Sequence, residues 1–79
     1  MVRVKTLIKR AIKYAKEHHL VSEKDILAVD VKHEQIPVLK IEEDVVEIYL
    51  RGSPVYVSVH FNKKGKITQS YIAWVNPPE

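Results

Sequence analysis

Histidines, carboxylates and serines are the side chains best suited to chemistry in this 79-residue sequence. His18 and His19 are adjacent on a predicted helix, so they point about 100° apart and cannot chelate as an i, i+4 pair does. His33 lies beside a predicted turn, and His60 lies on a predicted strand. No spacing of histidines and acids matches a metal motif, so we expect neither a metal nor a cofactor.

Ser58 and His60 come closest to a nucleophile and its base. They share one face of a predicted strand, but their spacing along it is about 7 Å, which is too long for a hydrogen bond. We expect no carboxylate beside the imidazole to orient it, as nucleophilic catalysis requires. The acidic run Glu42-Glu43-Asp44 is predicted to be a solvated turn. With only two glycines there is no phosphate-cradling loop. The sequence therefore favours a protein that is not an enzyme.

Basic side chains concentrate near the N-terminus, where residues 1–20 carry a net charge of +5. The cations of this stretch are Arg3, Lys5, Lys9, Arg10, Lys13 and Lys16. Such a row could follow a phosphate backbone. However, residues 21–50 carry a net charge of −5, and the strands lack the basic and aromatic pattern of sheet-type RNA binders. Nucleic-acid binding is therefore an alternative function, and a solvated basic face is the simpler interpretation.

These residues must be positioned by a helix followed by strands. Residues 3–19 are predicted to form an amphipathic helix, because apolar residues recur at spacings of three and four. The stripe consists of Val4, Leu7, Ile8, Ala11, Ile12 and Ala15. A short helical turn is expected at about residues 23–28, and a strand is expected to follow through Val29 and Val31.

Alternating patterns after residue 37 predict hairpins. The runs 38–42 and 45–50 flank Glu43-Asp44, which we expect to be a turn that pairs Leu39 with Ile48. Gly52-Ser53 suits the central positions of a second turn, with Gly52 first. That turn places Tyr49 opposite Tyr56. A third turn is expected over residues 62–65, because Gly65 suits the left-handed region.

The last strand completes the predicted sheet, with Phe61 opposite Ile67 and Val57 opposite Tyr71. This register places Ile72 and Trp74 on the same face as Tyr49 and Tyr56, away from the helix. The sequence thus predicts a single α+β domain over residues 1–79. It comprises the N-terminal amphipathic helix (about 3–19), the short helical turn (about 23–28) and an antiparallel β-meander of four to five strands, with the helix packed on one sheet face.

An aromatic patch on an uncovered sheet face favours binding to another protein. We expect a small non-enzymatic protein–protein interaction module that forms a homodimer or larger homo-oligomer through this face or a sheet edge. The expected contact residues are Tyr49, Tyr56, Ile72, Trp74 and Arg51. An inhibitor or antitoxin-like partner of a larger protein is a further alternative. No apolar run approaches the roughly 20 residues of a membrane span. We therefore expect a cytoplasmic protein that binds no membrane.

Overall fold

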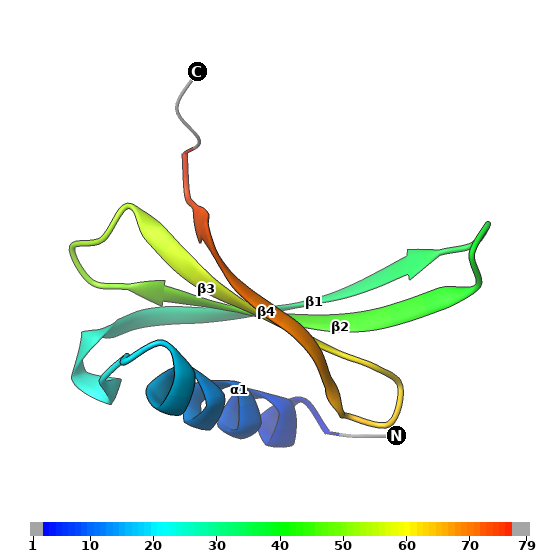
Figure 1. Cartoon of the computed structure of the whole chain (residues 1–79), viewed down its shortest axis with the longest axis horizontal. Helices are drawn as coiled ribbons and strands as arrows, with labels where there is room; N and C mark the ends of the chain where they lie inside the picture. Colours follow the sequence, from blue (N-terminus) through cyan, green and yellow to red (C-terminus); the bar gives the residue numbers. More distant parts are fainter. Residues whose placement is uncertain (1–2, 77–79) are drawn as a thin grey trace.

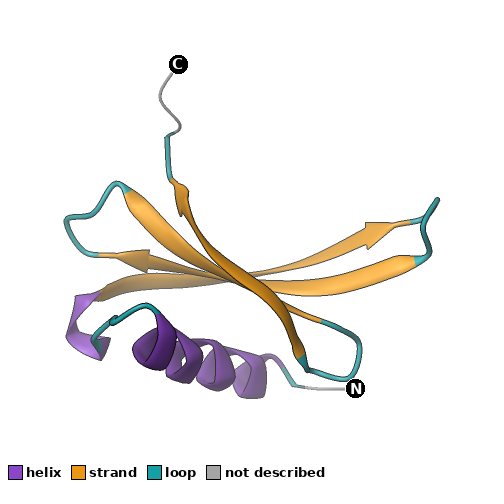
Figure 2. Cartoon of the chain, viewed as in Figure 1, coloured by secondary structure: helices purple, strands orange, loops and turns teal. Residues whose placement is uncertain are grey.

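A computed structural model describes residues 3–76. The chain forms α1 (Val4–His18), a short 3-10 turn (Glu23–Asp25), β1 (Ile26–Ile36), β2 (Ile41–Leu50), β3 (Val55–Phe61) and β4 (Ile67–Trp74). The four strands form one antiparallel sheet in the order β1-β2-β3-β4, and α1 lies across one face of it (Figures 1 and 2). The predicted α+β architecture, with its helix followed by a meander, is confirmed.

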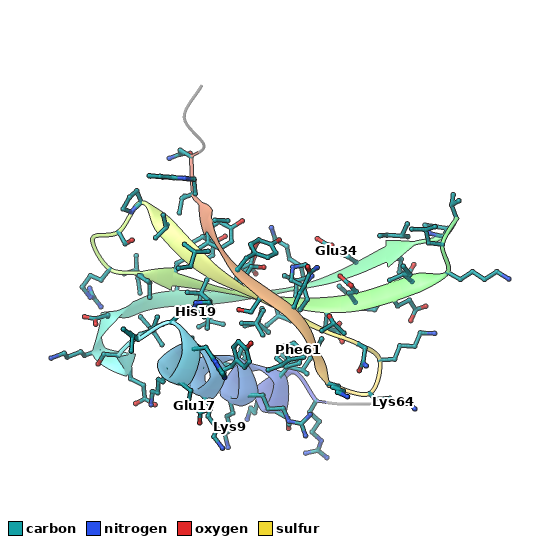
Figure 3. All side chains as sticks on the ribbon, viewed as in Figure 1. Lys9, Glu17, His19, Glu34, Phe61 and Lys64 are labelled. Carbon is teal, nitrogen blue, oxygen red and sulfur yellow. The ribbon has the colours of Figure 1, made fainter. Side chains whose placement is uncertain are left out.

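The hydrophobic core lies between α1 and the two central strands. α1 contributes Leu7, Ala11 and Ala15, and the central strands contribute Val46, Ile48, Val57, Val59 and Phe61. Figure 3 shows Phe61 pointing from the sheet towards the helix. None of these side chains is more than 1% exposed, whereas Val29 and Val31 of β1 are only half-buried. The helix therefore covers β2 and β3 well and leaves the sheet margins less protected.

The β1–β2 hairpin differs from the prediction. Its turn lies at residues 37–40, where Leu39 N–H donates to the Ile36 carbonyl at 3.1 Å and Lys40 adopts a positive φ of 54°. The predicted turn at Glu43-Asp44 is wrong, because both residues lie inside β2 and pair with Glu34 and His33. Pro37 decides the outcome, since proline suits the first central position of a turn and lacks the N–H that a strand uses.

The displaced turn makes this hairpin long. β1 contains 11 residues and β2 contains 10, and the tip projects beyond the helix (Figure 1). The predicted pairing of Leu39 with Ile48 is therefore wrong, since Ile48 pairs with Val29. The tip instead exposes four apolar side chains, namely Ile36, Val38, Leu39 and Ile41.

The two later turns follow the predicted chemistry closely. Tyr49 pairs with Tyr56 as expected, although Ser53 N–H donates to the Leu50 carbonyl, so Gly52 (φ 68°) is the second central residue rather than the first. The turn at residues 62–65 is confirmed, with Gly65 at φ 78°. The Asn62 side chain supports this turn by accepting the N–H groups of Lys64 and Lys66.

The register of β4 begins as predicted and then shifts. Phe61 pairs with Ile67, but an irregularity between His60 and Phe61 leaves Thr68 unpaired. Val57 then lies opposite Ile72 rather than Tyr71, and Val55 lies opposite Trp74. The predicted placement of Ile72 and Trp74 on the face away from the helix is therefore wrong. An extra residue in one strand of a pair exchanges the faces of every later side chain.

Candidate interaction surfaces

The sheet face opposite α1, here called the outer face, carries Tyr49 and Tyr56 as predicted. Their ring centroids lie 5.0 Å apart with a 32° tilt between the planes. The Tyr49 hydroxyl donates to a Glu47 carboxylate oxygen at 3.0 Å, and Lys32 forms an ion pair with the same oxygen at 3.1 Å. Both tyrosines are half-buried. These residues form a self-contained network rather than a bare aromatic patch.

The ionisation of this network is shifted by its surroundings. Desolvation raises the pKa of the Tyr49 phenol above 10.0, and the hydrogen bond to Glu47 raises it further. Desolvation also raises the pKa of Tyr56. The hydrogen bond to Glu47 raises the pKa of Lys32 above 10.5, because the carboxylate favours the charged ammonium. The two tyrosines therefore stay neutral, and Lys32 stays charged, to a higher pH than they would in an unfolded chain.

A second network on the outer face joins β2, β3 and β4 through His60. The Nδ1 atom of His60 lies 2.9 Å from Glu43 Oε2, and its Nε2 atom lies 3.2 Å from the Tyr71 hydroxyl. A neutral imidazole satisfies both contacts when Nδ1–H donates to the carboxylate and the phenol donates to Nε2. The expectation that no carboxylate lies beside His60 is wrong, because Glu43 belongs to β2 rather than to a turn.

This Glu–His–Tyr chain has the order of an acid–base relay, but its centre is covered. His60 is 6% exposed and Ser58 is 1% exposed, so a substrate has little access to either side chain. Every buried side-chain polar atom of the described residues has a hydrogen-bond partner. The geometry favours a role in fixing the three strands together.

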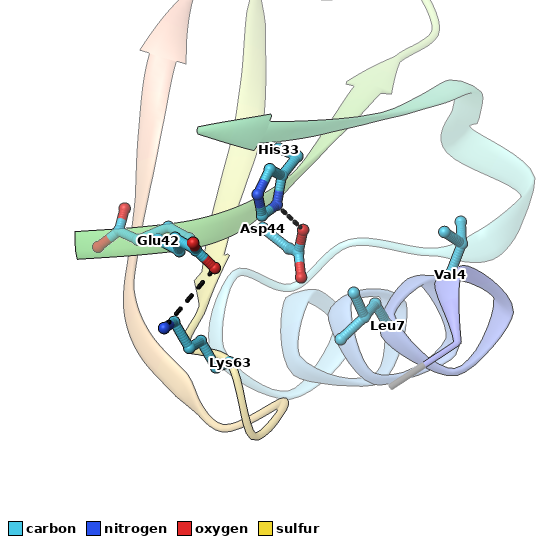
Figure 4. A pocket seen from close by; sticks show the side chains of 7 residues that line it. Val4, Leu7, His33, Glu42, Asp44 and Lys63 are labelled. Carbon is cyan, nitrogen blue, oxygen red and sulfur yellow. Dashed lines mark hydrogen bonds and ion pairs between the residues drawn. The ribbon is translucent and has the colours of Figure 1, made fainter. Parts of the chain in front are cut away.

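A cavity of about 350 Å³ lies near the start of α1 (Figure 4). Val4 and Leu7 line it from the helix, and His33, Glu42, Asp44 and Lys63 line it from the sheet side. Asp44 is paired with His33 at 2.8 Å, and Glu42 is paired with Lys63 at 3.8 Å. Across residues 3–76 no three histidine, aspartate or glutamate side chains converge as metal ligands would.

The basic side chains of α1 are exposed, as the helical pattern predicts. Figure 3 shows Lys9 and Glu17 pointing away from the sheet. Two of the cations are engaged, since Lys16 pairs with Glu23 at 2.6 Å and Arg10 donates to the Gly65 carbonyl at 2.8 Å. The others are Arg3, Lys5, Lys9 and Lys13, which form no ion pair within the described residues.

β4 is an edge strand with exposed apolar side chains on both faces. Ile72 is 56% exposed and Trp74 is 53% exposed on the helix side, while Tyr71 is 45% exposed on the outer face. No residue of β4 carries a charge. His19 at the end of α1 hydrogen-bonds Ser70 at 2.9 Å, and the strand beyond Ser70 is uncovered. Arg51 lies apart from this group, exposed in the β2–β3 turn.

β1 is the other edge strand. Asp30 lies directly opposite Glu47 of β2, so two carboxylates face each other across the strands. Like charges in such a pair are destabilising. Leu27, at the irregularity between Ile26 and Ala28, is 58% exposed. The sequence predicts this strand from the alternation of apolar and charged residues over 29–32. It does not predict that the strand lies at the edge of the sheet.

Comparisons with known proteins provide no relative. No family model, curated protein or solved structure matches the chain. None of the helices described is long and apolar enough to cross a membrane.

Proposed function

We propose that this chain is a non-enzymatic protein-interaction module that self-associates through an edge of its sheet. The observation that carries the proposal is the exposure of apolar side chains along and beside both edge strands. In the described residues these are Leu27, Ile36, Val38, Leu39 and Ile41 around β1, and Tyr71, Ile72, Trp74 and Val75 around β4. A domain this small gains stability by covering such surfaces, and an unpaired edge offers backbone groups to another strand.

A sheet edge supports association better than the outer face. Tyr49 and Tyr56 are half-buried against each other, and Tyr49 already donates its hydroxyl to Glu47. A partner on this face would have to cover Lys32 and Glu47, whose ion pair is partly solvated. Pairing at an edge instead adds backbone hydrogen bonds on both sides, which a partner on the outer face would not supply.

Sedimentation velocity of the full chain over a wide concentration range tests this proposal. We expect a species of twice 9.2 kDa to replace the 9.2 kDa monomer as the concentration rises. The midpoint of thermal unfolding should rise in parallel, since association stabilises the native state. A monomer that persists to millimolar concentration, with an unfolding midpoint independent of concentration, would contradict the proposal.

Nucleic-acid binding is the second candidate, favoured by the unpaired cations of α1. We expect Lys9 and Lys13 to contribute through phosphate contacts, so binding should weaken steeply with salt. A gel-shift assay at low salt would compare the native chain with the double variant Lys9→Glu, Lys13→Glu. Lys24→Glu, which alters an exposed lysine outside α1, serves as a control. The absence of a shift for the native chain would exclude this candidate.

A further inference from the structure

We infer that a second copy of this chain pairs with β1, antiparallel and strand against strand, about a two-fold axis that passes through Val31. This inference rests on the proposed self-association and specifies its surface. β1 is the longer edge, with 11 residues against 8 in β4, and it contains no proline. It lies at the margin of the sheet, with β2 on one side only (Figure 1).

The length of β1 and its charges select the same register. Val31 is the midpoint of Ile26–Ile36, so an axis there pairs the regular part of the strand, from Ala28 to Glu34, with its copy. Asp30 then lies directly opposite Lys32 of the second copy, and symmetry repeats the contact. Moving the axis by one residue would oppose Asp30 to Asp30 or Lys32 to Lys32. Like charges directly opposite each other disfavour these neighbouring registers.

Within a single chain, Asp30 and Lys32 remain accessible to a second copy. Asp30 faces Glu47 within its own sheet and forms no ion pair among the described residues. Lys32 reaches Glu47 at 3.1 Å, yet its side chain stays 52% exposed. A second copy would place a lysine directly opposite Asp30, where its own sheet places Glu47.

The same arrangement covers apolar side chains. Antiparallel pairing brings the Leu27 end of one strand towards the Ile36 end and hairpin tip of the other. Leu27 is 58% exposed, Ile36 is 43% exposed and Val38 is 91% exposed. At the centre, each half-buried Val31 would pack against its symmetry mate on the helix side. Val31 packs against the margin of the core and stays only half-buried, so part of its side chain is open to such a contact.

Single cysteines can map this contact, because the native chain contains none. Directly opposed residues of antiparallel strands have Cα atoms about 4.5–5.5 Å apart, which suits a disulfide. We expect Val31→Cys to form a disulfide-linked dimer readily under mild oxidation. Ile72→Cys reports on the β4 edge, and Lys13→Cys on α1 reports random collision. Circular dichroism of each reduced variant confirms that it folds.

The outcomes separate this inference from the general proposal of self-association. The β1 pair is supported if Val31→Cys cross-links at least about tenfold faster than the other two variants. If Ile72→Cys cross-links faster than Val31→Cys, the β1 pair is wrong but self-association is still supported. The same holds if all three variants cross-link equally slowly while the chain sediments as a dimer. A chain that is monomeric by sedimentation and shows only the Lys13→Cys rate at every position would overturn both.

Discussion

At the scale of single residues, the outer face is governed by side chains that bind one another. The pairing of Tyr49 with Tyr56 follows from the turn at Gly52 and could be predicted. The contacts of His60 with Glu43 and Tyr71 could not, because they depend on the position of the β1–β2 turn and on the irregularity in β4. The sequence predicts Glu43 in a turn that the chain makes elsewhere, and it predicts Tyr71 on the helix side of the sheet.

Removing the Tyr71 hydroxyl should destabilise the fold. Tyr71→Phe leaves the covered Nε2 atom of His60 without its phenol partner. We expect a loss of about 1–3 kcal/mol in the free energy of unfolding, measured by urea denaturation. Tyr14→Phe is the matched control, since Tyr14 forms no side-chain hydrogen bond within the described residues. Equal stabilities for the two variants would show that the contact between Tyr71 and His60 contributes nothing.

The raised pKa values of Tyr49 and Tyr56 predict a loss of stability in alkali. The folded chain holds these protons more tightly than the unfolded chain, so stability is fully present below pH 10.0 and falls as the pH rises above it. The raised pKa of Lys32 acts in the same direction above 10.5. Urea midpoints should therefore drop as the pH rises above about 10. The drop should be smaller in Tyr49→Phe, and a flat profile in the native chain would contradict the assignment.

At the scale of elements, local turn chemistry decides what can be predicted. α1 and the later turns were predictable because helical periodicity, Gly52 and Gly65 act through their own backbone preferences. The β1–β2 turn was not predictable from alternation, because the pattern over residues 38–42 resembles a strand, whereas the turn follows from Pro37. The face of Ile72 and Trp74 could not be predicted, because β4 mixes polar and apolar residues, so no pattern indicates the irregularity at Thr68.

The β2–β3 turn provides a test at this scale. Gly52 has a φ of 68°, and a Cβ atom there would meet no other atom within 4 Å. Any cost of Gly52→Ala therefore comes from the backbone alone, and we expect about 1–2 kcal/mol by urea denaturation. Gly52→Asn should cost less, because asparagine tolerates the left-handed region better. If Gly52→Ala costs no more free energy of unfolding than Gly52→Asn, this backbone conformation is not retained in the variants.

At the scale of the whole molecule, one helix is too small to cover a four-stranded sheet. α1 buries side chains of β2 and β3, so both sheet edges keep exposed apolar residues. Composition indicated a marginal small domain without disulfides, which is why self-association could be expected from the sequence. Which edge would associate could not be predicted, because the ends of β1 depend on the turn at Pro37.

Sedimentation of Asp30→Lys beside the native chain tests the central claim most directly. The variant places lysine opposite Lys32 of the second copy twice, yet it relieves the repulsion of Asp30 and Glu47 within each chain. Glu17→Lys on α1 changes the net charge equally and is the control. We predict dimers for the native chain and for Glu17→Lys, and a dissociation constant about tenfold higher for Asp30→Lys, which shifts it towards the 9.2 kDa monomer. The same dimer affinity for all three proteins, or a native chain that never dimerises, would contradict the account.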